Sequence, residues 1–452
     1  MESENSKNLS RRRFIGTSAF ALGGFTIVPA HAVSGLGHVA PSDKLNIAGI
    51  GIGGMGRIDL EDVAKTENIV ALCDVDWNNT VENVFKTYPG AQRYKDYRVM
   101  LDKQKDIDAV IVATPDHTHA IVSMETIRRG KHTYTEKPLT HTVYEARMLT
   151  QAARKYKVAT QMGNHGQAGD GPRRLQEMIH DGAIGTIREV HVWTDRPNRG
   201  LSDTYWPQGV RRPVETPPVP DTLDWDIFTG PAPLRPYHPS YHPFSWRGWL
   251  DYGTGALGDI GCHSLDPVFR ILKLKYPTSV QGTSTLVNGE SFPLGSMVTY
   301  DFPARMDMPP LRLIWYDGGL RPPRPAEMGT DIRMGAGGVL YIGSKGKILG
   351  NRLLPLSLNE SYKRPDPYLE SSPGHRQEWI LACKGGDTAG SNYEWAGPLT
   401  ETVLLGNIAL RPELREKLSY QSLQFDPEKL TFPNMPEADQ FLHYEYRNGW
   451  KL

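Results

Sequence analysis

A glycine-rich loop that directly follows a short apolar run constrains the fold more than any other feature of this chain. Residues 44–50 are rich in Leu, Ile and Ala, which is typical of a parallel strand buried on both faces. The loop Gly51-Ile52-Gly53-Gly54-Met55-Gly56 comes next, and we predict a helix over residues 57–65. Free backbone N–H groups at the start of such a helix favour phosphate groups.

The glycines of this loop have separate roles in a site for a dinucleotide. Gly51 permits the tight turn, Gly53 lets the backbone approach the pyrophosphate, and Gly56 lets helix and strand pack closely. A glycine turn of purely structural use is the alternative. We therefore predict that the cofactor is bound by this set of loop residues: Gly51, Gly53, Gly54, Met55 and Gly56.

The next predicted strand, residues 69–73, ends in Asp74, eighteen residues beyond Gly56. A carboxylate at this spacing accepts hydrogen bonds from the hydroxyls of a ribose. It would also repel a 2′-phosphate, so the sequence favours NAD over NADP. Arg93 and Lys95 are too distant in sequence to overturn this preference.

Two further strands are predicted, over residues 109–113 and 132–135, with a helix reaching Arg129 between them. This alternation predicts a doubly wound parallel sheet, whose ligands lie at the carboxyl ends of the strands. The residues that follow these strands are predicted to lie near the cofactor: Thr114, Pro115, His119, Glu136 and Lys137. Lys137 stands beside Pro138, so a surface residue in a turn is the alternative for it.

His117 and His119 could suggest a metal site, but no third ligand stands at a recognisable spacing. We predict that both are loop residues near the cofactor and that no metal is bound.

A second segment with candidate catalytic residues lies more than a hundred residues further on. Asp259 and His263 are four residues apart and follow a glycine-rich stretch, so on a helix they share one face. An imidazole suits reversible proton transfer, and His263 is our choice of general base for oxidation of an alcohol. Asp259 could hydrogen-bond a substrate hydroxyl or orient the histidine, and Lys137 could stabilise the developing alkoxide. The sequence leaves open whether Lys137 or His263 is the base, and a helix cap with a core histidine is the alternative.

These motifs together resemble those of the Gfo/Idh/MocA family, which is named for glucose–fructose oxidoreductase and inositol 2-dehydrogenase. The motifs are Gly51-x-Gly53-x-x-Gly56, Ala113-Thr114-Pro115, Glu136-Lys137-Pro138 and Gly255-x-x-x-Asp259-x-Gly261-x-His263. The resemblance implies that Lys137, Asp259 and His263 are catalytic. It also implies that Asn164 lies near the nicotinamide or the substrate.

The same resemblance implies an α/β fold: an N-terminal Rossmann sheet and a C-terminal α/β domain with a large open, mostly antiparallel sheet. We expect a signal over residues 1–32, an NAD-binding domain over 43–162, and a substrate-binding and oligomerisation domain over 163–452. In this family the C-terminal sheet often mediates contacts in dimers or tetramers, so a homodimer or homotetramer is expected.

An aromatic- and proline-rich excursion, residues 203–252, departs from the short family members. Aromatic faces bind sugars, but most of these side chains are expected to pack on their own domain or on a neighbouring subunit. Those nearest Asp259 in sequence are the better candidates for contact with substrate. The predicted substrate-binding set is Lys137, His165, Trp246, Arg247, Tyr252, Asp259 and His263.

The N-terminus predicts export. Ser10-Arg11-Arg12-Arg13-Phe14-Ile15-Gly16 opens a weakly apolar run to Pro29, and Ala30-His31-Ala32 offers small residues for cleavage. This looks like a twin-arginine signal, which would carry the folded protein with its cofactor to the periplasm. A basic tail or an uncleaved anchor is the alternative. No other run is long enough to cross a bilayer, so no membrane association is expected after signal removal.

Acidic and basic residues balance at 51 each, so no global field favours nucleic acid. Free NAD is not expected to be abundant outside the cytoplasm. We therefore expect an NAD-dependent oxidoreductase that keeps its cofactor and oxidises a secondary hydroxyl, with C3 preferred, of a sugar or glycoside. An NAD-dependent glycosidase that works by transient oxidation, elimination and re-reduction is the alternative. A non-catalytic NAD-binding sensor or assembly protein is a second one.

Overall fold

The computed structural model describes residues 43–330, 332–419, 421–447 and 449–452. The predicted twin-arginine signal lies outside the described residues. The structure described below is that of the compact unit Leu45–Leu452.

The first half of this unit is a six-stranded parallel sheet with the order β3-β2-β1-β4-β5-β6. Its strands are β1 (Asn46–Ile50), β2 (Asn68–Cys73), β3 (Gln92–Tyr94), β4 (Ala109–Val112), β5 (His132–Thr135) and β6 (Thr160–Met162). Its helices are α2 (Met55–Val63), α3 (Asn79–Thr87), α4 (Tyr97–Lys103), α5 (Asp116–Arg128) and α6 (Val143–Tyr156). The strand order reverses between β1 and β4, and ligands of such sheets bind at that point.

The second half holds an eight-stranded sheet with the order β15-β14-β13-β7-β12-β11-β10-β16, antiparallel except for the β7–β12 pair. Its strands are β7 (Ile187–Trp193), β10 (Ser279–Ser284), β11 (Ser296–Phe302), β12 (Leu311–Tyr316), β13 (Gly338–Gly343), β14 (Lys347–Leu349), β15 (Arg352–Leu354) and β16 (Leu423–Gln424). The predicted fold class, a Rossmann sheet followed by a large open, mostly antiparallel sheet, is confirmed.

The remaining elements connect and cover these sheets. The helices are η3 (His165–Ala168), α7 (Asp170–His180), α8 (Trp225–Thr229), η4 (Ser245–Gly248), α9 (Gly255–Ser264), α10 (Asp266–Ile271), α11 (Leu356–Ser361), α12 (His375–Cys383), α13 (Tyr393–Ala409), α14 (Pro412–Leu418) and η5 (Pro436–Phe441). A small hairpin is formed by β8 (Asn198–Arg199) and β9 (Asp203–Thr204).

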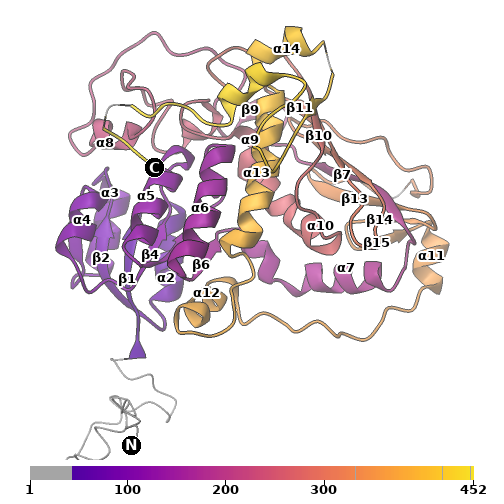
Figure 1. Ribbon diagram of the computed structural model, residues 1–452, viewed down its shortest axis with the longest axis horizontal. Helices are drawn as coiled ribbons and strands as arrows, with labels where there is room; N and C mark the ends of the chain where they lie inside the picture. Colours follow the sequence, from indigo (N-terminus) through magenta and orange to yellow (C-terminus); the bar gives the residue numbers. More distant parts are fainter. Residues whose placement is uncertain (1–42, 331, 420, 448) are drawn as a thin grey trace, which may run out of the picture. The chain divides into compact units, whose positions relative to one another are not determined.

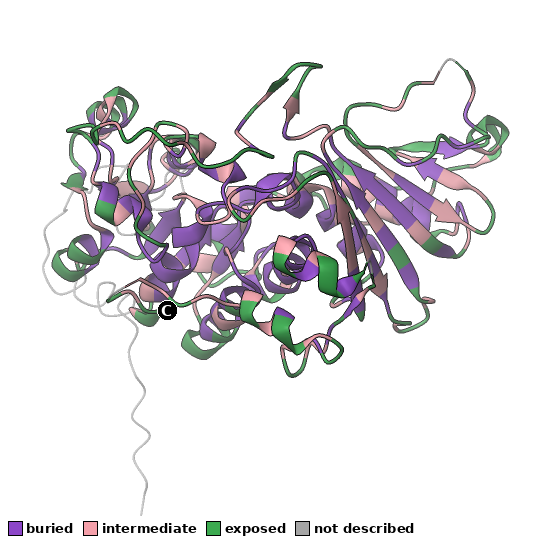
Figure 2. Cartoon of the chain, turned by 90° about the horizontal axis from the view of Figure 1, so that it is seen from above, coloured by how far each residue is buried: buried purple, intermediate pink, exposed green. Residues whose placement is uncertain are grey.

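Helix α13 joins the two halves. It lies between the sheets in Figure 1, and it contacts α6 and β6 on one side and α9, β10 and β11 on the other. Nearly all of its residues are buried, which explains why its sequence is apolar around the whole helix. Figure 2 shows the buried strands of the second sheet, and along β11 buried and more exposed residues alternate, as expected when one face covers a core.

The aromatic excursion packs mostly on itself. Its buried cluster consists of Leu223, Trp225, Phe228, Ala232, Tyr241, Trp246, Trp249 and Tyr252. This is the arrangement expected for most of its aromatic side chains. Within the described residues, the structure has no helix that is both long and apolar enough to cross a membrane.

Candidate active site

A cleft with about 1260 Å³ of space, partly open to solvent, lies at the carboxyl ends of the first sheet's strands. It is bounded on the other side by the excursion, at residues 242–247. The predicted site residues that line it are Gly51, Gly53, Gly54, Met55, Asp74, Thr114, Pro115, His119, Glu136, Lys137, Trp246 and Arg247. The cleft therefore brings both lobes of the chain to one place.

The glycine loop has the close contacts that a dinucleotide site requires. Gly51 has a φ of 78°, which favours glycine, and its N–H donates to the carbonyl of Cys73 at 2.9 Å. A Cβ atom on Gly56 would lie 2.1 Å from the carbonyl oxygen of Gly51. Helix α2 begins at Met55, two residues before its predicted start, and its N-cap Gly54 and first residue Met55 line the cleft. The first N–H groups of a helix have no partner within it.

Asp74 lies at the end of β2, on the wall of the cleft. Its carboxylate accepts hydrogen bonds from the backbone N–H groups of Ile52, at 2.8 Å, and Asp76, at 3.0 Å. Burial raises the pKa of Asp74 to about 6, so the group is ionised at neutral pH. A carboxylate held in this way has lone pairs left for a ribose diol and repels a 2′-phosphate, so these residues fit NAD.

Lys137 and Asp259 meet across the two lobes. The ammonium of Lys137 donates to a carboxylate oxygen and to the backbone carbonyl of Asp259, both at 2.7 Å. The Nε–H of Arg247 donates to the same carboxylate oxygen of Asp259 at 3.2 Å. Burial would raise the pKa of Asp259, but the charges of Lys137 and Arg247 hold it far below its usual value. Asp259 is thus a permanent anion that positions two cations.

Arg247 is also held by aromatic rings. Its guanidinium lies 4.2 Å from the ring centroid of Phe244 and 4.3 Å from that of Trp246. All three residues line the cleft. The two rings therefore hold the guanidinium of Arg247 in place at the cleft. Contact between Arg247 and the substrate stays a prediction.

His263 shares helix α9 with Asp259, as their spacing predicted. Burial and the neighbouring Lys137 ammonium lower the pKa of His263 to about 4. The imidazole is therefore neutral at physiological pH and able to accept a proton, although it binds that proton weakly.

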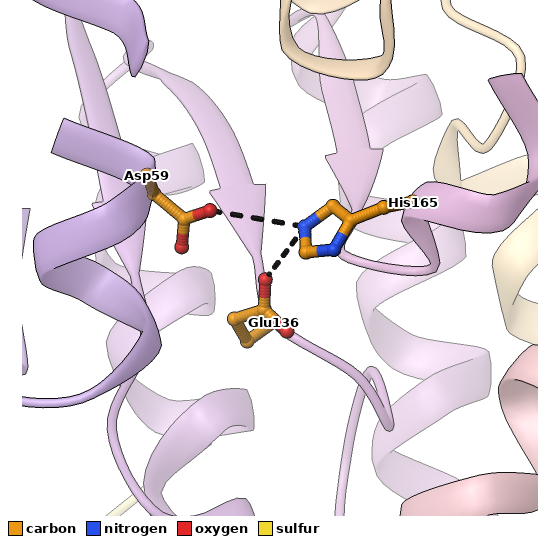
Figure 3. Close-up of side chains that lie close together, drawn as sticks. All are labelled: Asp59, Glu136 and His165. Carbon is orange, nitrogen blue, oxygen red and sulfur yellow. Dashed lines mark ion pairs between the residues drawn. The ribbon is translucent and has the colours of Figure 1, made fainter. Parts of the chain in front are cut away.

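Glu136 belongs to a cluster behind Lys137, shown in Figure 3 with Asp59 and His165. The Nε2 atom of His165 lies 3.2 Å from Glu136 and 3.8 Å from Asp59, and the hydroxyl of Tyr134 is 2.8 Å from the same nitrogen. Burial opposes ionisation of Glu136, but the hydrogen bond and charge of His165 and the charge of Lys137 hold its pKa at about 2. His165, a predicted substrate contact, does not line the cleft, and its Nε2 faces this cluster instead.

The ligand atoms of Asp59, Glu136 and His165 lie within 4.8 Å of one another, so their types and spacing are compatible with a metal ion. Arg376 already supplies a positive charge there, since its guanidinium lies 2.5 Å from Asp59 and 3.2 Å from His165. Asp59 has no exposed surface, and burial together with the Glu136 charge raises its pKa well above its usual value. We interpret the cluster as an ion-pair network. No sequence signal predicted the contribution of Asp59 or Arg376.

The prediction that His117 and His119 are loop residues is wrong. Pro115 is the N-cap of α5, so both histidines lie in its first turn and are buried. The ring nitrogens of His119 lie 2.7 Å from the carbonyls of Thr114 and Pro138, so this ring links the ends of β4 and β5. His117 contacts the carbonyls of Phe228 and Tyr252 in the same manner.

Five other predicted site residues are not among those that line the cleft: Gly56, Asn164, Tyr252, Asp259 and His263. Tyr252 has no exposed surface and belongs to the aromatic cluster of the excursion, so its nearness to Asp259 in sequence did not place it on the cleft. Asn164 follows β6, is 1% exposed and does not line the cleft either.

Asp116 lines the cleft and was not predicted. It is the first residue of α5, and one of its carboxylate oxygens accepts a hydrogen bond from the Thr254 hydroxyl at 2.6 Å. Thr254 precedes α9, so this bond links the Rossmann lobe to the helix that carries Asp259 and His263.

Comparisons with known proteins show the family of the chain. The family model described as "Oxidoreductase family, NAD-binding Rossmann fold" matches residues 45–164, and its partner, "Oxidoreductase family, C-terminal alpha/beta domain", matches residues 173–285. The chain belongs to the Gfo/Idh/MocA oxidoreductase family. Its first domain is an NAD-binding Rossmann domain.

Relatives within this family include enzymes of different names. A glycosyl hydrolase family 109 protein of Shewanella baltica is 26% identical over 205 residues, which are 40% of this chain and 44% of the relative. An inositol 2-dehydrogenase of Salmonella paratyphi B is 29% identical over 146 residues, 31% of this chain and 43% of the relative. The matches span less than half the length of either relative.

A similar solved structure is that of the WlbA dehydrogenase from Chromobacterium violaceum in complex with NADH and UDP-GlcNAcA. It has a TM-score of 0.58 and 18% identity, and the match covers 89% of this chain and 99% of that one. At this identity the likeness shows the shared fold.

Proposed function

We propose that this protein is an NAD-dependent dehydrogenase that oxidises a secondary hydroxyl, preferably at C3, of a sugar or glycoside. The observation that carries the proposal is the Lys137–Asp259 pair, in which an ammonium from the Rossmann lobe meets α9 of the second lobe beside the NAD cleft. The inositol 2-dehydrogenase relative and the sugar-nucleotide complex of the structural neighbour support a carbohydrate substrate.

The chain's own residues would divide the work as follows. Lys137, fixed by Asp259, donates a hydrogen bond to the reacting oxygen and stabilises negative charge as the O–H bond breaks. His263 is neutral at physiological pH and accepts the hydroxyl proton. Arg247 and Trp246 bound the substrate end of the cleft. NAD, when bound, accepts the hydride from the carbinol carbon.

The proposal includes export to the periplasm by the twin-arginine sequence at Arg11-Arg12. An exported NAD enzyme must keep its cofactor, because outside the cytoplasm free NAD is scarce. We therefore propose that NAD stays bound between turnovers and is reoxidised in place.

A redox-neutral glycosidase is the second candidate, favoured by the similarity to a glycosyl hydrolase family 109 protein. Oxidation of a ring hydroxyl makes the adjacent C–H acidic, so elimination can expel the aglycone. Addition of water and return of the hydride then complete hydrolysis without net oxidation.

A panel of methyl and nitrophenyl glycosides and free sugars separates the two candidates. The absorbance of bound nicotinamide, the keto-sugars and the released aglycone are measured together. A stable keto-glycoside supports the dehydrogenase, and aglycone release without accumulated reduced cofactor supports the glycosidase. Full turnover by both Lys137→Met and His263→Ala would contradict the assignment of the site.

A further inference from the structure

Asp116 is a buried carboxyl on the wall of the cleft that the proton transfer above does not use. It follows β4, next to β1, where the strand order reverses and the Rossmann sheet places its ligand. Its side chain is almost inaccessible, since the residue is only 3% exposed, yet it lines the same cleft as Lys137 and Arg247.

Charged groups from several elements act on this carboxyl. Burial opposes its ionisation, the Thr254 hydroxyl and the cations Lys137 and Arg247 favour it, and the anion Asp259 opposes it. On its own helix, His117 and His119 have both ring nitrogens at backbone carbonyls, and burial lowers their pKa values. The balance places the pKa of Asp116 at about 7.

Three other acid–base groups close to Lys137 have pKa values below neutral pH. Glu136 has a pKa of about 2, and the pKa of Asp259 is lower than its usual value. His263, the proposed base, has a pKa of about 4, so it would pass on a proton quickly and not retain it. Among these residues, Asp116 has the proton affinity that a temporary store requires.

The chemistry of the proposed function needs such a store. Oxidation of a secondary alcohol breaks the C–H bond, whose hydride goes to NAD, and the O–H bond, whose proton must go elsewhere, while the C=O bond forms. The positive charge of the nicotinamide ring is lost when the hydride arrives. A carboxylate near a lost positive charge gains proton affinity.

We propose that Asp116 holds this proton after His263 has passed it on: Asp116 is ionised when the bound nicotinamide is oxidised and protonated when the nicotinamide is reduced. The inference rests on the proposed function. The overall change is alcohol, NAD⁺ and Asp116 carboxylate to ketone, NADH and Asp116 carboxylic acid, so atoms and charge balance. If NAD is reoxidised in place by a carbonyl, hydride and proton both return from the enzyme, and no proton has to come from solvent.

The test is direct titration of the carboxyl in protein loaded with NAD or with NADH. Aspartate labelled with ¹³C at the carboxyl is followed by NMR, and the Asp116 signal is the one missing from Asp116→Asn. Its midpoint should be at least about one pH unit higher with NADH than with NAD. Asp317, a buried carboxyl of the second domain with a pKa of about 6, is the matched control and should titrate alike in both.

Thr254→Val keeps the test decisive if Asp116→Asn does not fold. It removes the hydroxyl that favours the Asp116 carboxylate, so it should move the same signal to a higher midpoint. An Asp116 midpoint that is identical with NAD and NADH, or below pH 5 with both, would overturn the inference and leave the dehydrogenase proposal standing. A protein that binds neither cofactor would refute both.

Discussion

The Lys137–Asp259 pair can be tested by a double-mutant cycle with Lys137→Met and Asp259→Asn. The two side chains are only 13% and 15% exposed, and Lys137 makes two hydrogen bonds of 2.7 Å to Asp259. Removal of one partner from a buried pair costs about 3–5 kcal/mol of unfolding free energy. Arg247 still lies 3.2 Å from Asp259, so we expect the lower end of that range, about 3 kcal/mol, for Lys137→Met.

Asp259→Asn leaves two cations without their carboxylate and should cost a similar amount. The double variant removes one of the unpaired charges together with its partner. Its loss of unfolding free energy should therefore be smaller than the sum of the two single losses by about 1–3 kcal/mol. The assay is urea unfolding at pH 7 followed by fluorescence and circular dichroism, and the two signals must coincide for the free energies to be used.

The matched control is the Arg154–Glu394 pair, which also joins the two halves but is 68% and 53% exposed. Its cycle should show much weaker coupling, because solvent screens exposed pairs. If the losses of unfolding free energy for Lys137→Met and Asp259→Asn add as nearly as those of the control pair, the two lobes do not meet through a buried ion pair. Our reasoning about the site would then be refuted.

Four further predictions follow from other contacts. Gly56→Ala should abolish NAD binding in a fluorescence titration, because its Cβ would lie 2.1 Å from a backbone oxygen; unchanged affinity would contradict the proposed loop geometry. Asp74→Asn should weaken NAD binding about tenfold and reduce discrimination against NADP in dissociation constants measured for both. Arg376→Leu should destabilise the fold by about 3–5 kcal/mol in urea, and Asp59→Leu in the same chain should recover most of the loss. Because burial raises the pKa of Asp116 from 3.8 to about 7, the free energy of unfolding should fall as pH rises through this window, and Asp116→Asn should remove up to roughly 4 kcal/mol of that dependence.

Features that depend on local sequence were predictable. The apolar run before Gly51 and the spacing to Asp74 are properties of one βαβ unit, so the Rossmann sheet and its cleft followed from short segments. The four-residue spacing of Asp259 and His263 likewise predicted a shared helix, which is α9.

Features that depend on distant partners were not predictable. Asp59 and Arg376 are 317 positions apart, and Asp116 and Thr254 are 138 apart, so no local pattern relates either pair. Tyr252 was predicted to contact the substrate because it is near Asp259 in sequence. Its ring is buried and does not lie on the cleft wall, so nearness in sequence was a poor guide to position. Side-chain direction in an irregular segment is set by tertiary packing, which in this case is the aromatic cluster.

The central claim is that a hydride passes from a sugar carbon to NAD retained beside Lys137 and Asp259. The most direct measurement uses methyl glucoside deuterated at C3, single turnover with the purified protein, and mass spectrometry of the cofactor released by denaturation. Our account predicts reduced cofactor carrying one deuterium, and the signal should be strongly diminished in Lys137→Met. A 3-keto-glycoside formed while the cofactor contains no deuterium would contradict the account.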